Sequence, residues 1–464
     1  MRPMNDAAPD SDTAPNEPGT ASPLCDVRRA VLSQTALTAA ILFAAAFLVR
    51  IVSAQLVRPD PTRSFMFDPS GNFSIARNLA HGDGFTLFGI PTTQVLPGYP
   101  ASLAGLFFVS GPSLEAALIF NAALGALSCA LTYAIARQLF DHTAGIVAGA
   151  IVVVLPSHVL LSTLLLSENL GTPLLLMTLF LSSRALMRGG SAAFGLALGA
   201  ITGFGVLSRG EVGVSLAALL TALVLSRTPR PRVEPWLLPA LLSIGVVVGA
   251  WVARNEVKMS MLAVSGSATT SMYGALGPPL IAFSPSDSAI AREGNPPLAL
   301  KDREAYASRA EMRQIIRYAR SHPGEELRRI PARFWGYAGN DGGALRWIAF
   351  DPPALGQKDS DRLSLICDIF YFSLLCAALL TLPFVLFLSD VRHVMLLLVI
   401  VGWSALHTLV FTGESHYHVP ILPLVSIIAA GGCVACWRRI RGRIGRRGCG
   451  ANESHPYLLI DRAL

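Results

Sequence analysis

QTALTAAILFAAAFLVRIVSAQLV, residues 34–57, is an apolar run interrupted by a single charge, Arg50. At 1.5 Å per residue, a helix of this length crosses the ~30 Å hydrocarbon layer of a bilayer. Similar runs recur along the chain, and of its 464 residues 52% are hydrophobic and only 14% are charged. Charged residues make up about a quarter of a typical soluble domain, so this composition indicates a polytopic membrane protein.

The hydropathy pattern predicts an all-α polytopic membrane protein of about ten transmembrane helices with juxtamembrane helices. The predicted spans are 34–57, 114–137, 142–163, 168–187, 191–208, 211–227, 235–253, 364–388, 392–411 and 419–437. The segment 97–110 is also apolar. A crossing there would move every later arginine cluster to the opposite side, so we expect a juxtamembrane or re-entrant helix on the outer side.

The arginines predict the orientation of the spans. With a cytoplasmic N-terminus, alternation places five arginine-bearing segments inside, as the positive-inside rule requires. These segments contain Arg137, Arg184 and Arg188, Arg227 with Arg230 and Arg232, Arg392, and Arg438 through Arg447. We therefore expect a multi-pass protein of the bacterial inner membrane with both termini in the cytoplasm. The net charge of +7 is spread over short turns, so it does not predict a nucleic-acid partner.

This topology divides the chain into a disordered cytoplasmic tail (1–30), a transmembrane domain (31–437) and a basic cytoplasmic tail (438–464). Two larger periplasmic loops, 58–113 and 254–363, leave the transmembrane domain on its outer side. Arg50 is expected to snorkel outward from the first span.

Two helices, 301–320 and 323–338, are predicted in the second loop, with a division at His322-Pro323. Leu327, Phe334 and Trp335 share one face of the second helix, opposite its arginines. This pattern is typical of a helix that lies on a membrane surface.

The seven cysteines include none in a predicted external loop, which argues against a disulfide framework. Cys433 and Cys436 lack a second ligand pair for zinc and are interpreted as helix-packing residues. No cofactor is predicted with certainty. A divalent metal is left open, with no metal ligands assigned, because no dense external cluster of Asp, Glu and His demands one.

Several external motifs lie in a common order. ARNLAHGDGF (76–85) and PGYP (97–100) follow Asp68, and further motifs are LLLSENL (164–170), GFGVLSRGEV (203–212), WVARNEV (251–257), IIRYARSHPGEELRRIPARFWGY (315–337) and GESHYHVPILPLV (413–425). Together they resemble the C-type (GT-C) membrane glycosyltransferases. The most similar branch is the bacterial one that resembles protein O-mannosyltransferases and the lipid A aminoarabinose transferase.

The resemblance implies a GT-C fold and transfer of a sugar, with inversion, from a polyprenyl-phosphate donor to an acceptor hydroxyl on the periplasmic side. Asp68 matches the catalytic aspartate and would act as general base, with Asp83 as the runner-up. The leaving group is already a good anion, so the site needs positive charge around it and no acid partner. Residues expected to bind the substrate or the lipid phosphate are Arg254, Arg209, His416, His418, Glu168 and Tyr99.

Each residue also has a structural interpretation. Asp68 before Pro69 is a well-placed N-cap, and Asp83 between two glycines suits a turn. Glu168 could stabilise a helix N-terminus, and Arg209 could pair with Glu211. Arg254 could be a snorkelling flank, although the positive-inside rule gives no reason for an arginine on the outer side.

The sequence departs from the family at Phe73, where relatives often have Tyr, and at His416-Tyr417-His418, where Arg-Tyr is usual. The paired acidic motif of the true protein O-mannosyltransferases is absent, so the acceptor stays open between a glycan, a lipid and a protein. Membrane lipids are the other expected partner.

Two other functions compete with the enzyme: a transporter or flippase of a lipid-linked sugar, and a non-catalytic scaffold. Transporters place ionisable groups near the bilayer midplane, often in repeated halves. Here the charges collect at the outer interface, which favours a transferase, for example of a cell-envelope glycan. The sequence does not specify the sugar.

Overall fold

We describe a computed structural model that covers residues 23–57, 67–225, 234–282, 284–294, 299–349, 356–387 and 390–448. The fold of these residues is all-α, as predicted, apart from one small hairpin of two-residue strands. Seven helices of the described chain are long and apolar enough to cross a membrane. They are α1 (Pro23–Val57), α4 (Leu114–Leu139), α7 (Glu168–Arg188), α10 (Glu234–Met259), α16 (Gln357–Leu386), α17 (Val391–Leu409) and α18 (Leu422–Gly448).

Shorter apolar helices account for the other three predicted spans and for the juxtamembrane segment. They are α5 (His142–Val154), α8 (Ala192–Ser208), α9 (Val214–Leu225) with the 3-10 turn η1 (Gly210–Gly213) before it, and α3 (Gly98–Ser110). The ends of two predicted spans, at 226–227 and at 388, lie outside the described residues.

The span predicted as one helix over 142–163 is divided in two. Helix α5 ends at Val154, and a short helix α6 (Pro156–Leu161) follows. Leu155 between them has φ −61° and ψ 109°, an extended conformation. Proline disfavours the helical conformation in the residue before it and has no N–H to donate, which explains the break. Hydropathy averages over this break and does not reveal it.

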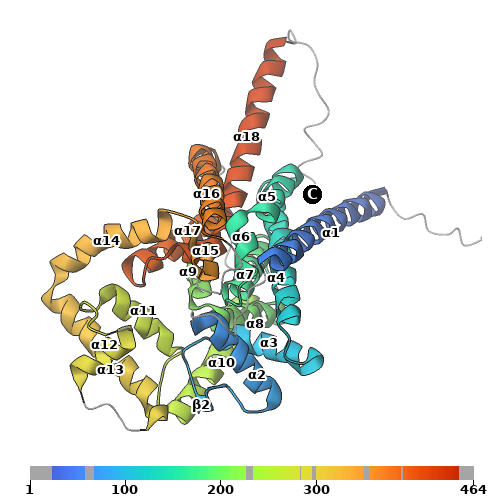
Figure 1. Ribbon diagram of the computed structural model, residues 1–464. Coiled ribbons are helices and arrows are strands. Elements are labelled where there is room, and N and C mark those ends of the chain that lie inside the picture. Colours follow the sequence, from blue (N-terminus) through green and yellow to red (C-terminus); the bar gives the residue numbers. More distant parts are fainter. Residues whose placement is uncertain are drawn as a thin grey trace, which may run out of the picture.

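The elements predicted to be external gather at the end of the bundle opposite the C-terminal part of α18 (Figure 1). They are α2 (Phe67–His81), β1 (Thr86–Leu87), β2 (Ile90–Pro91), α11 (Gly266–Leu276), α12 (Pro285–Glu293), α13 (Leu300–Ser321), α14 (Pro323–Ala338), α15 (Gly343–Ala349) and the 3-10 turn η3 (Ser415–Ile421). The two helices predicted in the second loop are confirmed, and the division between them falls at His322.

The terminal helices extend into both predicted tails. Helix α1 begins at Pro23, inside the tail predicted for 1–30, and α18 continues to Gly448, inside the tail predicted for 438–464. An apolar span nucleates a helix, and propagating it costs less than starting it, so flanking helix-forming residues join it. Residues 1–22 and 449–464 lie outside the described residues.

Charged residues at the two ends of the bundle agree with the predicted alternation of spans. At one end, Arg392 donates to the carbonyl of Gln138 at 3.2 Å, and Arg438 pairs with Asp141 at 2.9 Å. The polar termini of α2, α7 and α8 meet at the other end. Which end faces the cytoplasm stays a prediction.

The expectation that Arg50 snorkels outward is wrong, because its side chain is fully buried among α1, α4, α5 and α6. Its guanidinium contacts Nδ1 of His158 at 2.9 Å and donates to the carbonyl of Val152 at 3.3 Å. Gly125 makes the space, since a Cβ there would collide with the arginine side chain. Polar partners inside the bundle replace the water that a snorkelling arginine would reach.

Candidate active site

Three buried asparagines hold the loop before α7 in place. Asn72 of α2 donates to the carbonyl of Leu165 at 2.8 Å, Asn121 of α4 to that of Leu164 at 2.9 Å, and Asn169 of α7 also to Leu164, at 2.8 Å. Buried carbonyls need such partners because water cannot reach them. These three hydrogen bonds fix the residue at which α7 starts, and so they also fix the position of the Glu168 side chain.

Glu168 and Arg209 form the centre of the site. The carboxylate of Glu168, in the first turn of α7, lies 2.6 Å from the guanidinium of Arg209, which follows α8. Arg209 also pairs with Glu211 at 3.1 Å, as one interpretation of the sequence anticipated. A Cβ at Gly171 would lie 2.9 Å from Cγ and Cδ of Arg209, so the glycine lets the arginine cross α7.

The 413–418 turn, which carries the motif GESHYHVP, contributes the C-terminal residues of the site. His416 Nε2 lies 3.7 Å from Glu168, and its Nδ1 lies 3.5 Å from Glu414. The ring of Tyr417 lies under the Arg209 guanidinium, 5.4 Å from its centroid to Cζ. His407 of α17 reaches Glu211 at 3.2 Å.

Asp68 lies in the first turn of α2 and not before the helix, which begins at Phe67. A carboxylate there is stabilised by the helix dipole, so the structural role foreseen for it shifts from cap to first turn. Burial, aided by the charge of Glu168, raises the pKa of the Asp68 carboxyl from 3.8 to about 6, against an opposing effect of Arg209. The charges of Glu168, Arg209 and Glu414 therefore all act on Asp68.

We refer to Asp68, Glu168, Arg209, Glu211, His407, Glu414 and His416 as the central cluster. Its members come from α2, α7, α8, η1, α17 and the 413–418 turn, and four of them are carboxylates while one is a guanidinium. Among the described residues, no group of three or more His, Cys, Asp or Glu side chains is arranged to hold a metal ion.

His418, two residues beyond His416, lies in a separate buried pair. Its Nδ1 faces the carbonyl of Tyr337 at 2.6 Å, and its Nε2 faces the carboxyl of Asp341 at 2.8 Å. A carbonyl only accepts, so Nδ1 donates the first of these hydrogen bonds, and Nε2 makes the second with the Asp341 carboxyl. Both ring nitrogens are thereby occupied, and a phosphate contact by His418 stays a prediction.

Among the described residues, Arg254, Tyr99 and Asp83 make their hydrogen bonds to groups outside the central cluster. Arg254 donates to the carbonyls of Phe85 and Thr92, at 3.0 and 3.1 Å, and its guanidinium stacks on Trp251. Tyr99 is buried and donates to Asn121 at 2.8 Å, so it supports the asparagine that holds the 162–167 loop. Asp83 is exposed between two glycines of positive φ, as the turn interpretation expected.

Sequence reasoning missed His407, Asp341 and any role for Glu414. A histidine inside a predicted span, near its end, was the one available signal for His407, since ionisable residues inside a membrane are rare. Asp341 follows a Gly-Asn turn and Glu414 precedes the histidines, without a pattern that marks either.

An apolar groove of about 450 Å³ lies between α5, α16 and α18. Ile366, Ile369, Phe370 and Ala377 line it on one face of α16. Tyr371, on the neighbouring face of the same helix, stacks on His418 with 4.5 Å between ring centroids.

A family model matches residues 95–252. Its description is dolichyl-phosphate-mannose-protein mannosyltransferase. The matched part contains Tyr99, Glu168 and Arg209, while Asp68 and Arg254 lie outside it. Over these residues the match confirms the resemblance predicted from the motifs.

None of the curated proteins matches the sequence. Among solved structures, the chain is similar to the Archaeoglobus fulgidus oligosaccharyltransferase tethered with an acceptor peptide, at 13% identity and a TM-score of 0.49, over 89% of this chain and 52% of that one. It is also similar to ArnT from Cupriavidus metallidurans bound to undecaprenyl phosphate, at 14% identity and a TM-score of 0.42, over 87% and 78% of the two chains. The chain thus spans about half the length of the oligosaccharyltransferase.

Proposed function

We propose that the protein is a membrane glycosyltransferase that moves a sugar from a polyprenyl-phosphate donor to an acceptor hydroxyl on the periplasmic side, with inversion. Asp68 is the general base. The mannosyltransferase family match over residues 95–252 supports the class of reaction.

The observation that carries this proposal is the meeting of distant motifs around one titratable carboxyl. Asp68, the SEN motif at 167–169, the SRGE motif at 208–211 and the 413–418 turn are spread over the chain, yet their charged residues act on one another. The Glu168 side chain is buried and that of Glu211 is only 14% exposed, and placing carboxylates in such an environment is costly. Perturbed carboxyls in such a cluster are typical of an active site.

The protonation of Asp68 suits base catalysis. With a pKa of about 6 the carboxyl is ionised at neutral pH, yet it is a stronger base than an unperturbed aspartate. In the reaction it takes the proton of the acceptor O–H while the acceptor oxygen bonds to the anomeric carbon. The bond from that carbon to the donor phosphate oxygen breaks, and polyprenyl phosphate leaves.

The other members of the cluster have a positioning role in this proposal. Arg209 is neutralised by Glu168 and Glu211, so it holds the carboxylates in place and leaves little charge for a donor phosphate. The apolar groove beside α16 fits the isoprenoid chain of the donor, because it is lined by aliphatic and aromatic side chains.

The test is a transfer assay with the purified protein in vesicles, a radiolabelled polyprenyl-phosphate sugar and a panel of glycan, lipid and peptide acceptors. Label recovered on an acceptor, in amounts that depend on Asp68, is the expected result. Movement of label across the bilayer without transfer would identify a transporter instead. Absence of both in a well-folded preparation, with acceptors from the native envelope included, would favour a scaffold.

A further inference from the structure

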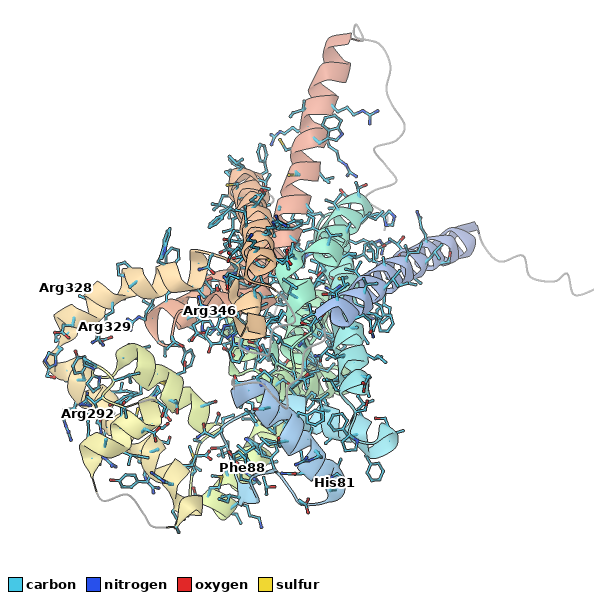
Figure 2. All side chains as sticks on the ribbon, viewed as in Figure 1. His81, Phe88, Arg292, Arg328, Arg329 and Arg346 are labelled. Atoms are coloured by element: carbon cyan, nitrogen blue, oxygen red, sulfur yellow. The ribbon has the colours of Figure 1, made fainter. Side chains whose placement is uncertain are left out.

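Arg346 occupies the rim of the central cluster. It is the exposed residue of the short helix α15, whose Ala344, Leu345, Trp347 and Ile348 are buried. The helix is pressed against the 413–418 turn: a Cβ at Gly343 would lie 2.5 Å from the backbone nitrogen of His416, and the Trp347 ring lies 5.3 Å from the His416 ring. Figure 2 shows Arg346 between the bundle and the outward-reaching α14.

Of the three arginines compared here, Arg346 is the one whose guanidinium is free to bind an anion. Arg209 is paired with two carboxylates, and Arg254 donates to backbone carbonyls of the first loop. The Arg346 guanidinium makes no hydrogen bond or ion pair with any residue that the structure describes. Its charge nevertheless acts on the cluster. Burial raises the pKa of the Glu414 carboxyl, and of the neighbouring charges Arg346 opposes this increase most strongly.

We propose that Arg346 binds the phosphate of the lipid-linked donor, at the rim of the central cluster. The inference rests on the proposed function and adds a binding residue to it. The donor is a phosphodiester with one negative charge, and the leaving polyprenyl phosphate is a monoester that gains a second charge as the bond to the sugar breaks. An exposed guanidinium at this position offers paired N–H donors to the growing charge, which the carboxylates of the cluster would otherwise repel.

Arg346 should therefore contact the product more strongly than the donor. Binding is measured with a short-chain prenyl phosphate, and the matching prenyl alcohol is the probe that lacks phosphate, with the protein in nanodiscs of neutral lipid. We expect Arg346→Ala to weaken prenyl-phosphate binding about tenfold, as for one charge-assisted contact, and to leave the alcohol unchanged. Arg346→Lys should restore part of the affinity. Arg320→Ala, which removes an exposed arginine from the end of α13, is the matched control.

The outcomes separate the inference from the proposed function. If the parent protein binds prenyl phosphate and Arg346→Ala binds it equally well, the inference fails and the function stands. If the parent protein binds no prenyl phosphate, the proposed function itself fails. Competition by phosphatidylglycerol at equal strength would reassign Arg346 to lipid headgroups and overturn the inference. Full recovery of binding in Arg346→Ala with Glu414→Gln would also overturn it, because Arg346 would then only balance Glu414.

Discussion

The carboxyl group of Asp68 has a structural and a chemical reason to lie in the first turn of α2, and one substitution separates them. Asp68→Asn keeps a polar side chain at the helix N-terminus, so the helix should form normally. Asn cannot take the acceptor proton, so transfer should fall by the ~10²- to 10⁴-fold typical of a lost general base. Initial rates and the detergent melting temperature are measured together. A folded variant at the parental rate would remove Asp68 from the mechanism, and Asp83→Asn would be made next.

The raised pKa of Asp68 predicts opposite effects of pH on rate and stability. Activity should rise with pH up to about 6 and then level off, because the base must be ionised. A raised folded-state pKa means that the aspartate favours the folded state below its ordinary value of 3.8 and loses this contribution as pH rises through about 6. At pH 8 the free energy of unfolding of Asp68→Asn should therefore exceed that of the parent, by at most about 3 kcal/mol, and the difference should vanish near pH 4. A constant difference across this range would contradict the assignment.

Some residues of the site could be predicted from the sequence around them, and others could not. Asp68, Glu168 and Arg209 sit in short motifs, and their placement at helix ends follows from nearby Ser, Pro and Gly. His407 carries no such mark, because its partner Glu211 is far away in sequence. Glu414 contacts His416 only two residues later, but no motif marks that pair. Arg254 is predicted to bind the lipid phosphate, and this stays a prediction. In the structure its guanidinium donates to the carbonyls of Phe85 and Thr92 in the first loop.

The Arg209 side chain packs directly against α7 at Gly171, and a substitution there tests whether the site depends on this close contact. Gly171→Ala would bring a Cβ to 2.9 Å from the Arg209 side chain and force it off its two carboxylates. We expect transfer to fall about tenfold or more, since a displaced buried ion pair loses well over 1.4 kcal/mol. Gly249→Ala on α10 is the control, because its Cβ would meet no atom within 4 Å. Equal activity in both variants would show that the Arg209 position is not needed.

Helix α14 leaves the bundle with its apolar side chains uncovered, and this predicts contact with the membrane. Leu327, Phe334 and Trp335 are 69, 51 and 71% exposed, and Arg328 and Arg329 lie near its outer end (Figure 2). In a cysteine-free background, a fluorophore at position 335 should be quenched by lipid-borne nitroxides and protected from iodide in water. A fluorophore at Arg320→Cys should show the reverse. Quenching of both positions by iodide alone would place α14 in water.

At this scale the spans were predictable and their interruptions were not. Long apolar runs are a signal that exceeds any local propensity, so all ten predicted spans correspond to helices. The division of α5 from α6 depends on Pro156 and was lost in the average over the run. Helix α15 was not predicted, because its burial depends on contacts with α6, α16 and η3 and not on a sequence period.

The whole molecule has two chemically different ends, and the prediction for its orientation can be tested by labelling. Single cysteines at Ala192, the first residue of α8, and at Arg320, in α13, are introduced after the seven native cysteines are replaced. A membrane-impermeant maleimide added outside intact cells should label position 320 and leave position 192 unlabelled until the cells are opened. The reverse pattern would show the opposite membrane orientation, with the central cluster on the cytoplasmic side.

Arg50 constrains how the protein is made. Released alone into the bilayer, α1 would carry a charge that costs about 2.5 to 3.5 kcal/mol at the helix centre. The groups that accept it, the carbonyl of Val152 and the ring of His158, lie 102 and 108 residues later in the chain. At about 5 to 20 residues per second a ribosome needs on the order of 5 to 20 s to reach them. During that interval α1 must stay beside the insertion machinery or shift toward the surface, so its position in the bilayer becomes stable only after α5 and α6 have been made and enclose Arg50.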